Sequence, residues 1–348
     1  FDKDAGSKTT FQYLKMFLNK GYAVKFLGDN YLHEEPYTTV LQQMGIEVLY
    51  GQEYLTGIWD WLDKNGKEIS IAYLNRPHIA AKYVDYIAEH TDIKIIYYGH
   101  DLHFMREFRE YELTGDTGKK RDSEYWKSIE FSLMHKAAVS YYPSVVEEEA
   151  IHDVDETVNV KAITAYVYDT FLDNLNQDFA KREGLLFVGG FAHPPNADAV
   201  LWFAKEVFPM IREKLNVNFY VVGSRVTDEI KALEQPGSKI IVKGFVSEEE
   251  LSELYRSCRI VIVPLRYGAG VKGKVVEAIY NGAPIVTTSV GSEGIPGVED
   301  VLLVEDKPED FAGAVVKLYG DEKRLAQLSQ KTQEYIKAHF SVDAAWEV

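Results

Sequence analysis

Short apolar runs alternate along the whole chain with longer stretches in which apolar residues recur every three or four positions. An uninterrupted apolar run is typical of a strand buried on both faces of a parallel sheet, and the longer spacing is typical of an amphipathic helix. Strands that alternate with helices in this way form crossover units. The pattern therefore predicts an α/β fold with doubly wound parallel sheets.

The first half of the chain carries one set of these elements. Its predicted strands lie near residues 22–28, 46–50, 69–74, 93–98, 137–142 and 158–164. Amphipathic helices are predicted over residues 9–19 and 79–90, where apolar residues line one face. We expect a first Rossmann-like domain over residues 1–165.

The second half restarts the same rhythm. Its predicted strands lie near residues 185–188, 217–222, 239–242, 259–264, 284–288 and 301–304, and a helical pattern covers residues 322–339. Residues 166–183 are polar and acidic and predict a linker. We expect a second Rossmann-like domain over residues 184–338 and a tail over residues 339–348 that is free to cross back to the first. The two sheets would face each other across one cleft.

The start of the chain interrupts this scheme. It reads Phe1-Asp2-Lys3-Asp4, which is neither an initiator Met nor a signal peptide. The following residues, Ala5, Gly6 and Ser7, fit the glycine loop that comes after the first strand of such a domain, yet almost nothing precedes them. Either the start was trimmed or the chain is a module of a larger polypeptide, and we favour the second.

Composition narrows the functional classes. The 348 residues include 38 Lys and Arg against 54 Asp and Glu, which gives a formal net charge of −16. A hydrophobic content of 46% excludes the disordered class, and the acidic balance argues against nucleic acid as a partner. The single cysteine, Cys258, excludes an internal disulfide and fits a cytoplasmic protein.

The sequence contains no apolar segment long enough to span a membrane. No apolar stretch approaches the roughly 20 residues that cross a bilayer. Trp59 and Trp61, with Tyr54 and Leu55, would form an exposed patch for acceptor binding or for peripheral attachment to the inner face of a membrane. Packing of these rings into the core is the interpretation that we favour.

The most informative segment covers residues 261–278, where a buried strand, a glycine loop and a helix follow one another. Open parallel sheets bind ligands at the carboxyl ends of their strands. Here Arg266, Lys272 and Lys274 crowd the start of a helix, and such a site suits a diphosphate. Glu277 follows within reach of a ribose diol. The alternative is a solvated cationic turn in which Glu277 pairs with a lysine.

Residues 242–294 resemble the nucleotide-sugar half of the GT-B glycosyltransferases, in particular the retaining family 4. The matching text is Lys243-Gly244-Phe245-Val246, Glu250-Leu251, Leu254-Tyr255, Val263-Pro264-Leu265, Gly268-Ala269-Gly270, Lys274, Glu277-Ala278, Gly282-Ala283-Pro284-Ile285-Val286-Thr287-Thr288 and Gly291-Ser292-Glu293-Gly294. The resemblance implies that the second domain binds the nucleotide sugar and that the first lies on the acceptor side.

The resemblance also implies roles for single residues. Glu277 matches the glutamate that holds the donor ribose, and Phe245 and Val246 match the segment that meets the base. Backbone amides of the glycine loops hold the phosphates or the sugar, and the positions concerned are Gly6, Gly268, Gly270, Gly291, Ser292, Glu293 and Gly294.

Two departures from the family pattern stand out. Ala269 replaces the first glutamate of the family's pair, so contacts to the sugar hydroxyls must come from elsewhere. The basic residues usual after the first strand of the second domain are also missing. We expect Arg225, Arg266, Lys272 and Lys274 to take over the diphosphate.

In the first half, His100 and Asp101 follow a predicted strand. The imidazole of His100 can donate a hydrogen bond to a sugar hydroxyl or to the leaving phosphate. The alternative is a loop histidine capped by Asp101, or Asp101 as the cap of the next helix. Arg76, His78 and His103 are candidates for acceptor binding, with structural roles equally open for them.

These observations predict a transferase that moves a sugar from a nucleotide diphosphate sugar to a hydroxyl of a glycan or glycoconjugate, with retention and without a metal or cofactor. The expected catalytic set is His100, Asp101, Lys274 and Glu277. A nucleotide-sugar epimerase of the same fold is one alternative. An inactive donor-binding module is another, and Ala269 is the main argument for it.

Overall fold

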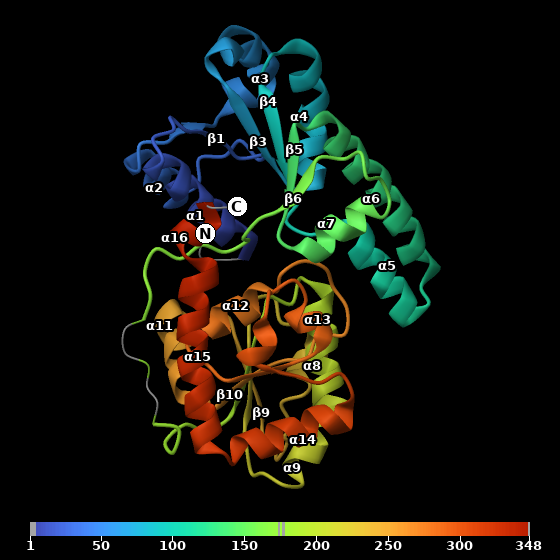
Figure 1. The fold of residues 1–348 in the computed structure, drawn as a ribbon, viewed down its shortest axis with the longest axis vertical. Coiled ribbons are helices and arrows are strands. Elements are labelled where there is room, and N and C mark those ends of the chain that lie inside the picture. Colours follow the sequence, from blue (N-terminus) through green and yellow to red (C-terminus); the bar gives the residue numbers. More distant parts are fainter. Residues whose placement is uncertain (1–4, 173–174, 176–177, 347–348) are drawn as a thin grey trace. The chain divides into compact units, whose positions relative to one another are not determined.

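The computed structural model describes residues 5–172, 175 and 178–346. The chain divides into two compact units (Figure 1). Within the described ranges, unit 1 holds residues 5–111 and 116–167, and unit 2 holds residues 112–115 and 168–346. Residues 1–4, on which the expectation of a missing first strand rests, lie outside the described residues.

Unit 2 is built on one parallel sheet in the order β12-β11-β10-β7-β8-β9. The strands are β7 (Leu185–Val188), β8 (Phe219–Val222), β9 (Ile240–Gly244), β10 (Ile260–Val263), β11 (Ile285–Thr287) and β12 (Leu303–Val304). All the strands predicted for the second half are confirmed. β10 is buried at every position, as its unbroken β-branched run requires.

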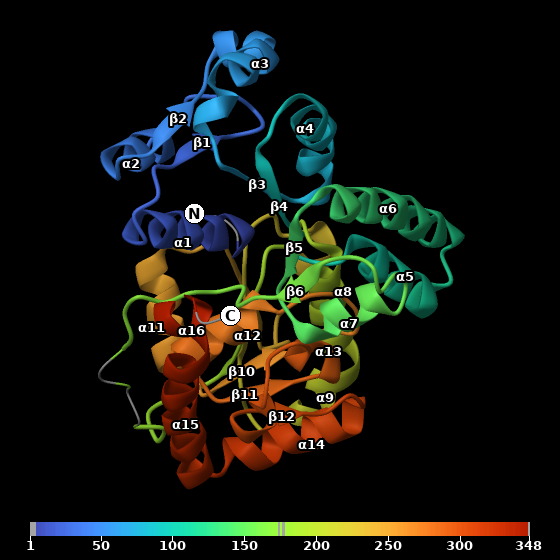
Figure 2. The same cartoon turned by 45° about the horizontal axis from the view of Figure 1, so that its top comes forward.

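Helices cover this sheet (Figures 1 and 2). They are α8 (Pro194–Trp202), α9 (Phe208–Arg212), α10 (Asp228–Lys231), α11 (Glu248–Ser257), α12 (Gly273–Tyr280), α13 (Ser289–Ser292), α14 (Pro308–Tyr319) and α15 (Glu322–Phe340). The short helix α16 (Val342–Trp346) follows α15 and packs on it. A π-helical turn (Phe203–Val207) joins α8 to α9, and a 3-10 turn covers Val298–Asp300. α12 packs on α15, and α14 packs on α9.

Unit 1 contains two parallel sheets that share no hydrogen-bonded strand among the described residues. One pairs β1 (Lys25–Leu27) with β2 (Glu47–Leu49). The other has the order β3-β4-β5-β6 and consists of β3 (Ile71–Asn75), β4 (Lys94–Tyr98), β5 (Val139–Tyr142) and β6 (Val160–Ala162). The predicted strands are all present, but they do not form the single sheet that we expected.

The helices of unit 1 are α1 (Ala5–Asn19), α2 (Tyr37–Gln43), α3 (Gln52–Asn65), α4 (Pro77–His90), α5 (His103–Thr114), α6 (Thr117–Lys136) and α7 (Val145–His152), with a 3-10 turn at Gly66–Glu68. Trp59 and Trp61 of α3 pack against the hydrophobic core beneath them. This confirms core packing for these rings. No helix in the described part of the chain is long and apolar enough to span a bilayer.

Gly6 differs from its predicted setting. α1 begins at Ala5, so Gly6 lies in the first turn of a helix and its carbonyl accepts a hydrogen bond from Thr10 Oγ1 at 3.0 Å. The structure therefore does not place Gly6 in a glycine loop.

Candidate functional site

The loop between β10 and α12 has the shape that the sequence predicts. Leu265 after the strand is buried, and two glycines follow with positive φ, Gly268 at 144° and Gly270 at 71°. Residues with a side chain rarely adopt such backbone angles. Lys272 occupies the N-cap position of α12, so the loop delivers its cations to the start of a helix, where backbone N–H groups point outward.

Lys272 is anchored inside this loop. Its side chain is 8% exposed, and Nζ donates to the carbonyl oxygen of Gly270. The Glu293 carboxylate lies 3.6 Å from the same Nζ. The side chain of Lys272 also passes close to Gly268, because a Cβ added at Gly268 would lie 3.5 Å from Lys272 Cε. Lys272 therefore holds the loop together while it contributes positive charge.

Lys274 has a different environment. It is half-buried, and within the described residues it forms no hydrogen bond or ion pair. Its Cε would lie 3.2 Å from a Cβ added at Gly189. Burial and the nearby charge of Lys272 lower its pKa to about 8, against the opposing charge of Glu277. An ammonium group in this state gains strongly from an anionic ligand.

The loop after β7 approaches the same place. Asn196 on α8 is buried and donates from Nδ2 to the Gly190 carbonyl oxygen at 2.7 Å. Its Oδ1 is buried and has no hydrogen-bond partner among the residues that the structure describes. A Cβ added at Gly189 would lie 3.0 Å from Nδ2 of this amide, so Asn196 and Lys274 meet over Gly189. A ligand here can offer an anion to Lys274 and a donor to Asn196.

The backbone is packed tightly in this region. A Cβ added at Gly223, directly after β8, would lie 1.9 Å from the carbonyl oxygen of Gly189. At Gly291 an added Cβ would lie 2.0 Å from Thr287 Oγ1 and 3.0 Å from the Val263 carbonyl oxygen. The carboxyl ends of these strands therefore approach closely only because glycine stands at both positions.

Arg266 does not join the two lysines. Its guanidinium forms a bidentate pair with Asp198 of α8, with Nε 2.9 Å from Oδ2 and Nη2 on Oδ1. The hydrogen bonds to Asp198 raise the pKa of Arg266. The carboxylate compensates a charge that we expected to face a diphosphate, so the cationic centre of the loop is Lys272 with Lys274.

The remaining donor-site candidates of unit 2 lie in loops at the carboxyl edge of the sheet. Phe245 follows β9 and is 68% exposed, Val246 is half-buried, and Arg225 is exposed after β8. Glu277 lies in α12, one turn after Lys274. The amide of Gly291 already donates to Thr288 Oγ1 at 3.2 Å, and the amide of Ser292 donates to the Thr288 carbonyl at 3.1 Å. These two amides have partners within the protein, which the resemblance did not anticipate.

In unit 1, His100 follows β4 and adopts a φ of 65°. Its Nε2 lies 3.1 Å from Asn75 Oδ1 at the end of β3. Because an amide oxygen only accepts hydrogen bonds, Nε2 carries the proton and Nδ1 is the nitrogen that can accept in a neutral ring. Gly99 is tightly packed, since a Cβ there would lie 2.2 Å from the Tyr142 ring.

His103 does not have the setting of an acceptor-binding residue. Its Nδ1 lies 3.5 Å from carboxylate oxygens of Asp101 and Glu130, and its ring packs on Trp126. Burial alone would lower the pKa of His103, but the hydrogen bond to Glu130 and the charge of Asp101 raise it. His103 therefore belongs to a charged network inside unit 1.

The same network includes Asp101, which forms an ion pair with Arg106, and Arg106 also binds Glu107. Arg76 follows β3 at the N-cap of α4 with a φ of 63°, and His78 is exposed on the first turn of α4. Partial burial and the charge of Arg76 lower the pKa of His78. The structure thus brings His100, Asn75 and Arg76 to neighbouring strand ends.

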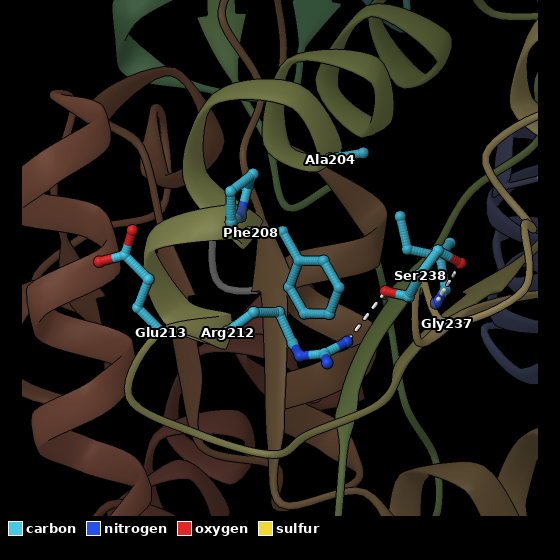
Figure 3. Close-up of a pocket in the computed structure, with 8 residues that line it drawn as sticks. Ala204, Phe208, Arg212, Glu213, Gly237 and Ser238 are labelled. Atoms are coloured by element: carbon cyan, nitrogen blue, oxygen red, sulfur yellow. Dashed lines mark hydrogen bonds between the residues drawn. The ribbon is translucent and has the colours of Figure 1, made fainter.

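A separate groove of about 480 Å³ lies in unit 2 (Figure 3). Phe208, Arg212 and Gly237 line it, and Arg212 Nη1 donates to the Ser238 carbonyl at 3.1 Å. Because Ser238 precedes β9, the groove lies at the amino end of this strand, away from the loops described above. It contains none of the predicted site residues.

Residues 182–321 match the protein family described as "Glycosyl transferases group 1". This match begins just before β7 and contains both lysines and all the strands of the second sheet. Residues 182–321 form a group 1 glycosyltransferase domain. The loop between β10 and α12 is therefore the candidate donor site of a glycosyltransferase domain.

Known structures extend the similarity to the whole chain. Sucrose-phosphate synthase from Thermosynechococcus elongatus superposes with a TM-score of 0.73 at 16% identity, over 98% of this chain and 90% of that one. HepE from Anabaena in complex with UDP-glucose gives a TM-score of 0.70 at 14% identity, over 100% and 95% of the two chains. These likenesses show that the fold is that of the GT-B glycosyltransferases.

A curated relative covers less of the chain. An uncharacterized 44.6 kDa protein in the cps region of Klebsiella pneumoniae is 32% identical over 143 residues, which are 39% of this chain and 35% of that protein. The matched part is thus about a third of the relative's length. TarM, with a TM-score of 0.65 at 15% identity, is matched over 83% of this chain and 56% of its own.

Sequence reasoning missed Asn196 and Asn75, whose amides now stand beside the main candidates of each unit. Asn196 follows the glycines after β7, and Asn75 ends β3, so the rule that ligands bind at strand ends contained a signal for both. In the described ranges no group of three or more His, Cys, Asp or Glu side chains is placed to hold a metal ion.

Proposed function

We propose that this protein transfers a sugar from a nucleotide diphosphate sugar to a hydroxyl group, with retention of the anomeric configuration. The observation that supports this most strongly is the pair of cations at the start of α12 in a group 1 glycosyltransferase domain. One of them, Lys274, lacks an ionic partner within the described residues, and its pKa is lowered. A diphosphate would supply the missing negative charge.

Transition-state stabilisation follows from the same geometry. Cleavage of the glycosidic bond to the phosphate leaves negative charge on the diphosphate oxygens. Lys274 and Lys272, together with the N–H groups that begin α12, oppose this charge where it develops. We assign the ribose hydroxyls to Glu277 and the base to Phe245 and Val246, as the resemblance implies. Arg225 remains a further candidate for the diphosphate.

No metal or cofactor enters the proposed reaction, because the lysines supply the charge that a divalent cation supplies in other transferases. We propose that the leaving phosphate takes the proton of the acceptor hydroxyl on the same face of the sugar, which gives retention. His100 is proposed to donate a hydrogen bond to a sugar hydroxyl or to the leaving phosphate. That role requires a proton on Nδ1, since Nε2 is directed to Asn75.

For the substrates, the proposal draws on proteins of similar fold. HepE was crystallised with UDP-glucose and TarM with UDP and alpha-GlcNAc-glycerol. The Klebsiella pneumoniae relative is named for its place in a cps region. We propose a UDP-sugar as donor and a cell-surface glycan or glycoconjugate as acceptor. The reaction is proposed to take place in the cytoplasm, with peripheral attachment to the inner face of the membrane as an option.

Calorimetric titration with UDP-, GDP- and dTDP-sugars tests the donor, and NMR of the product tests the anomeric configuration. We expect one nucleotide to bind with EDTA present and its sugar to be released slowly to water without an acceptor. Failure of every donor to bind would refute the proposal. An inverted product would refute retention.

Ala269 supports a second candidate, a donor-binding module without catalysis. The residue is half-buried in the loop before Lys272 and has no side-chain group for a sugar hydroxyl. Binding of a donor without any turnover, unchanged in a His100→Ala variant, would favour this candidate. Release of UDP together with an altered sugar would favour an epimerase instead.

A further inference from the structure

Among the described residues of unit 1, two carboxylates have no solvent exposure, those of Glu130 on α6 and Glu147 on α7. Burial raises the pKa of Glu130, although hydrogen bonds from His103 oppose the effect. An ionisable group is costly to bury unless it is fully hydrogen-bonded. The hydrogen-bond partners of these two carboxylates explain why they are buried.

Between them, the two carboxylates accept hydrogen bonds from three consecutive backbone amides. The Leu102 amide donates to Glu147 Oε1 at 3.1 Å, the His103 amide to Glu130 Oε1 at 2.9 Å, and the Phe104 amide to Glu130 Oε2 at 3.1 Å. These amides begin α5, where no carbonyl of the helix itself can accept from them. The start of α5 is therefore fastened to α6 and α7 by carboxylates distant in sequence.

A residue near the helix start usually supplies such a cap. Asp101 has the right chemistry and position, but its carboxylate is paired with Arg106 and lies near His103. The capping role thus passes to Glu130 and Glu147. Burying two carboxylates costs more free energy than a local cap does. In return, the position of α5 depends on α6 and α7.

The segment fixed in this way carries His100. On one side, Gly99 is pressed against the Tyr142 ring at the end of β5. On the other side, Leu102 is fully buried and held by Glu147. Between them His100 adopts a φ of 65°, which for a side chain other than glycine persists only when its surroundings enforce it. Both ends of this two-residue bridge are fixed, so the direction of the imidazole is fixed as well.

We propose that Glu130 and Glu147 are positioning residues for His100, because they clamp the start of α5 and hold His100 in its left-handed conformation against Asn75. The link to catalysis rests on the proposed function of His100. The structural half of the proposal, that the two carboxylates set the orientation of the imidazole, stands independently of it.

We expect substitution by glutamine to have different effects at the two positions. In Glu130→Gln, one oxygen that accepts from an amide becomes an NH₂ group that faces the Phe104 or His103 N–H, so one contact is lost. In Glu147→Gln, the carbonyl can keep the Leu102 amide while the Ser144 hydroxyl, now 3.2 Å from Oε2, reverses and accepts. Glu147→Gln therefore serves as the conservative variant and Glu147→Ala as the disruptive one.

Glu148→Gln is the matched control. Glu148 is the next residue on α7, and its Oε2 accepts from the Ala162 amide of β6 at 2.8 Å. Like Glu147, Glu148 is a carboxylate on α7 that accepts from a backbone amide, but this amide lies outside the segment that carries His100. Any effect of lost charge or lost stability in α7 appears in the control as well.

The test measures the side-chain ¹⁵N and ¹H signals and the titration of His100 by NMR, together with kcat and the Kd for the donor. We expect Glu130→Gln and Glu147→Ala to change the His100 signals and to lower kcat on the order of 10- to 100-fold, with the donor Kd within about twofold. Glu147→Gln and Glu148→Gln should stay near the wild type.

His100 signals that move no more in Glu130→Gln and Glu147→Ala than in Glu148→Gln would overturn the proposal. If Glu130→Gln does not fold, the pair Glu147→Ala and Glu147→Gln decides alone. A wild-type protein that binds no nucleotide sugar would refute the proposed function, while the NMR comparison would still decide whether the carboxylates orient the imidazole.

Discussion

The two units place their candidate residues by opposite means. In unit 2 the loops at the carboxyl edge of the sheet are held by close backbone packing, with glycine where an added Cβ would collide with a neighbouring chain. In unit 1 the loop with His100 is held by buried charged groups, above all Glu130, Glu147 and the His103 network. One site is set by shape and the other by electrostatics.

The two units should therefore respond to different kinds of change. Packing constraints respond to added volume and are insensitive to pH, whereas a charged network responds to protonation and to the loss of a single carboxylate. Lys274 is the exception in unit 2, because its own charge is poorly compensated until a ligand arrives.

Gly223→Ala should be the most damaging of the substitutions considered. The new Cβ would lie 1.9 Å from a backbone carbonyl, that of Gly189, so neither side can move without shifting β7 or β8. We expect a loss of about 3 kcal/mol or more in the unfolding free energy, at the upper end of the range for overpacked cores. Urea denaturation followed by circular dichroism measures it at any pH.

Gly313→Ala is the control for glycine replacement itself. Gly313 is exposed within α14, and no atom lies within 4 Å of an added Cβ. Alanine there should raise the unfolding free energy by roughly 0.5–1 kcal/mol through helix propensity. If Gly223→Ala were as stable as Gly313→Ala, the packing account of unit 2 would be wrong.

Lys274→Gln should weaken nucleotide binding more than any other single loss of charge. A hydrogen bond to a charged group contributes roughly 1.5–3 kcal/mol, so the Kd for UDP should rise roughly 10- to 100-fold. Arg266→Gln should change the Kd little, because Asp198 already pairs with that guanidinium. Calorimetry compares the two variants, and an equal loss in both would show that Arg266 leaves Asp198 to bind the ligand.

The pH dependence of binding follows from the same residue. A pKa of about 8 means that Lys274 loses its proton as the pH rises above 8, and the Kd for UDP should rise with it. The folded state holds this proton more weakly than the unfolded chain, so the unfolding free energy should also rise between about pH 8 and the ordinary lysine value near 10.4. The contribution of Lys274 to both slopes should be absent in Lys274→Gln, so each slope should differ from the wild type by that amount.

Much of unit 2 could be predicted from the sequence. The buried strands of a parallel sheet are unbroken apolar runs, and the glycines and lysines after β10 follow one another locally, so the cationic loop was visible before its structure. The pairing of Arg266 with Asp198 could not be predicted. The two residues are far apart in the sequence and meet only because α8 packs beside the loop.

Unit 1 shows where such reasoning stops. Its strands were found, yet β1 and β2 form a sheet separate from that of β3 to β6, and the pairing of strands leaves no local trace in the sequence. His100 was identified from its place after β4, but the carboxylates that fix it come from α6 and α7. Glutamates in amphipathic helices usually face solvent, so nothing in their spacing marked Glu130 or Glu147 as buried.

His103 should give unit 1 a pH-dependent stability. Because its folded pKa is raised, the stabilisation is fully present below the ordinary histidine value near 6.5 and is lost as the pH rises through the folded pKa. We expect His103→Gln to remove roughly 0.5–1 kcal/mol at pH 5.5 and much less at pH 8.5. Urea unfolding of the variant at both pH values measures this, and an equal loss at both would contradict the charged network.

Phe245→Ala should have the smallest effect on stability and a modest one on binding. The ring is 68% exposed after β9, so its removal should leave the unfolding free energy unchanged. If it stacks on the nucleotide base, about 1 kcal/mol is lost, and the Kd should rise roughly three- to tenfold. The loss must be equal for UDP and for a UDP-sugar, since the base is common to both. Phe108→Ala, which removes an exposed ring from α5, should leave both Kd values unchanged. A Phe245→Ala variant with wild-type affinity would place the base elsewhere in unit 2.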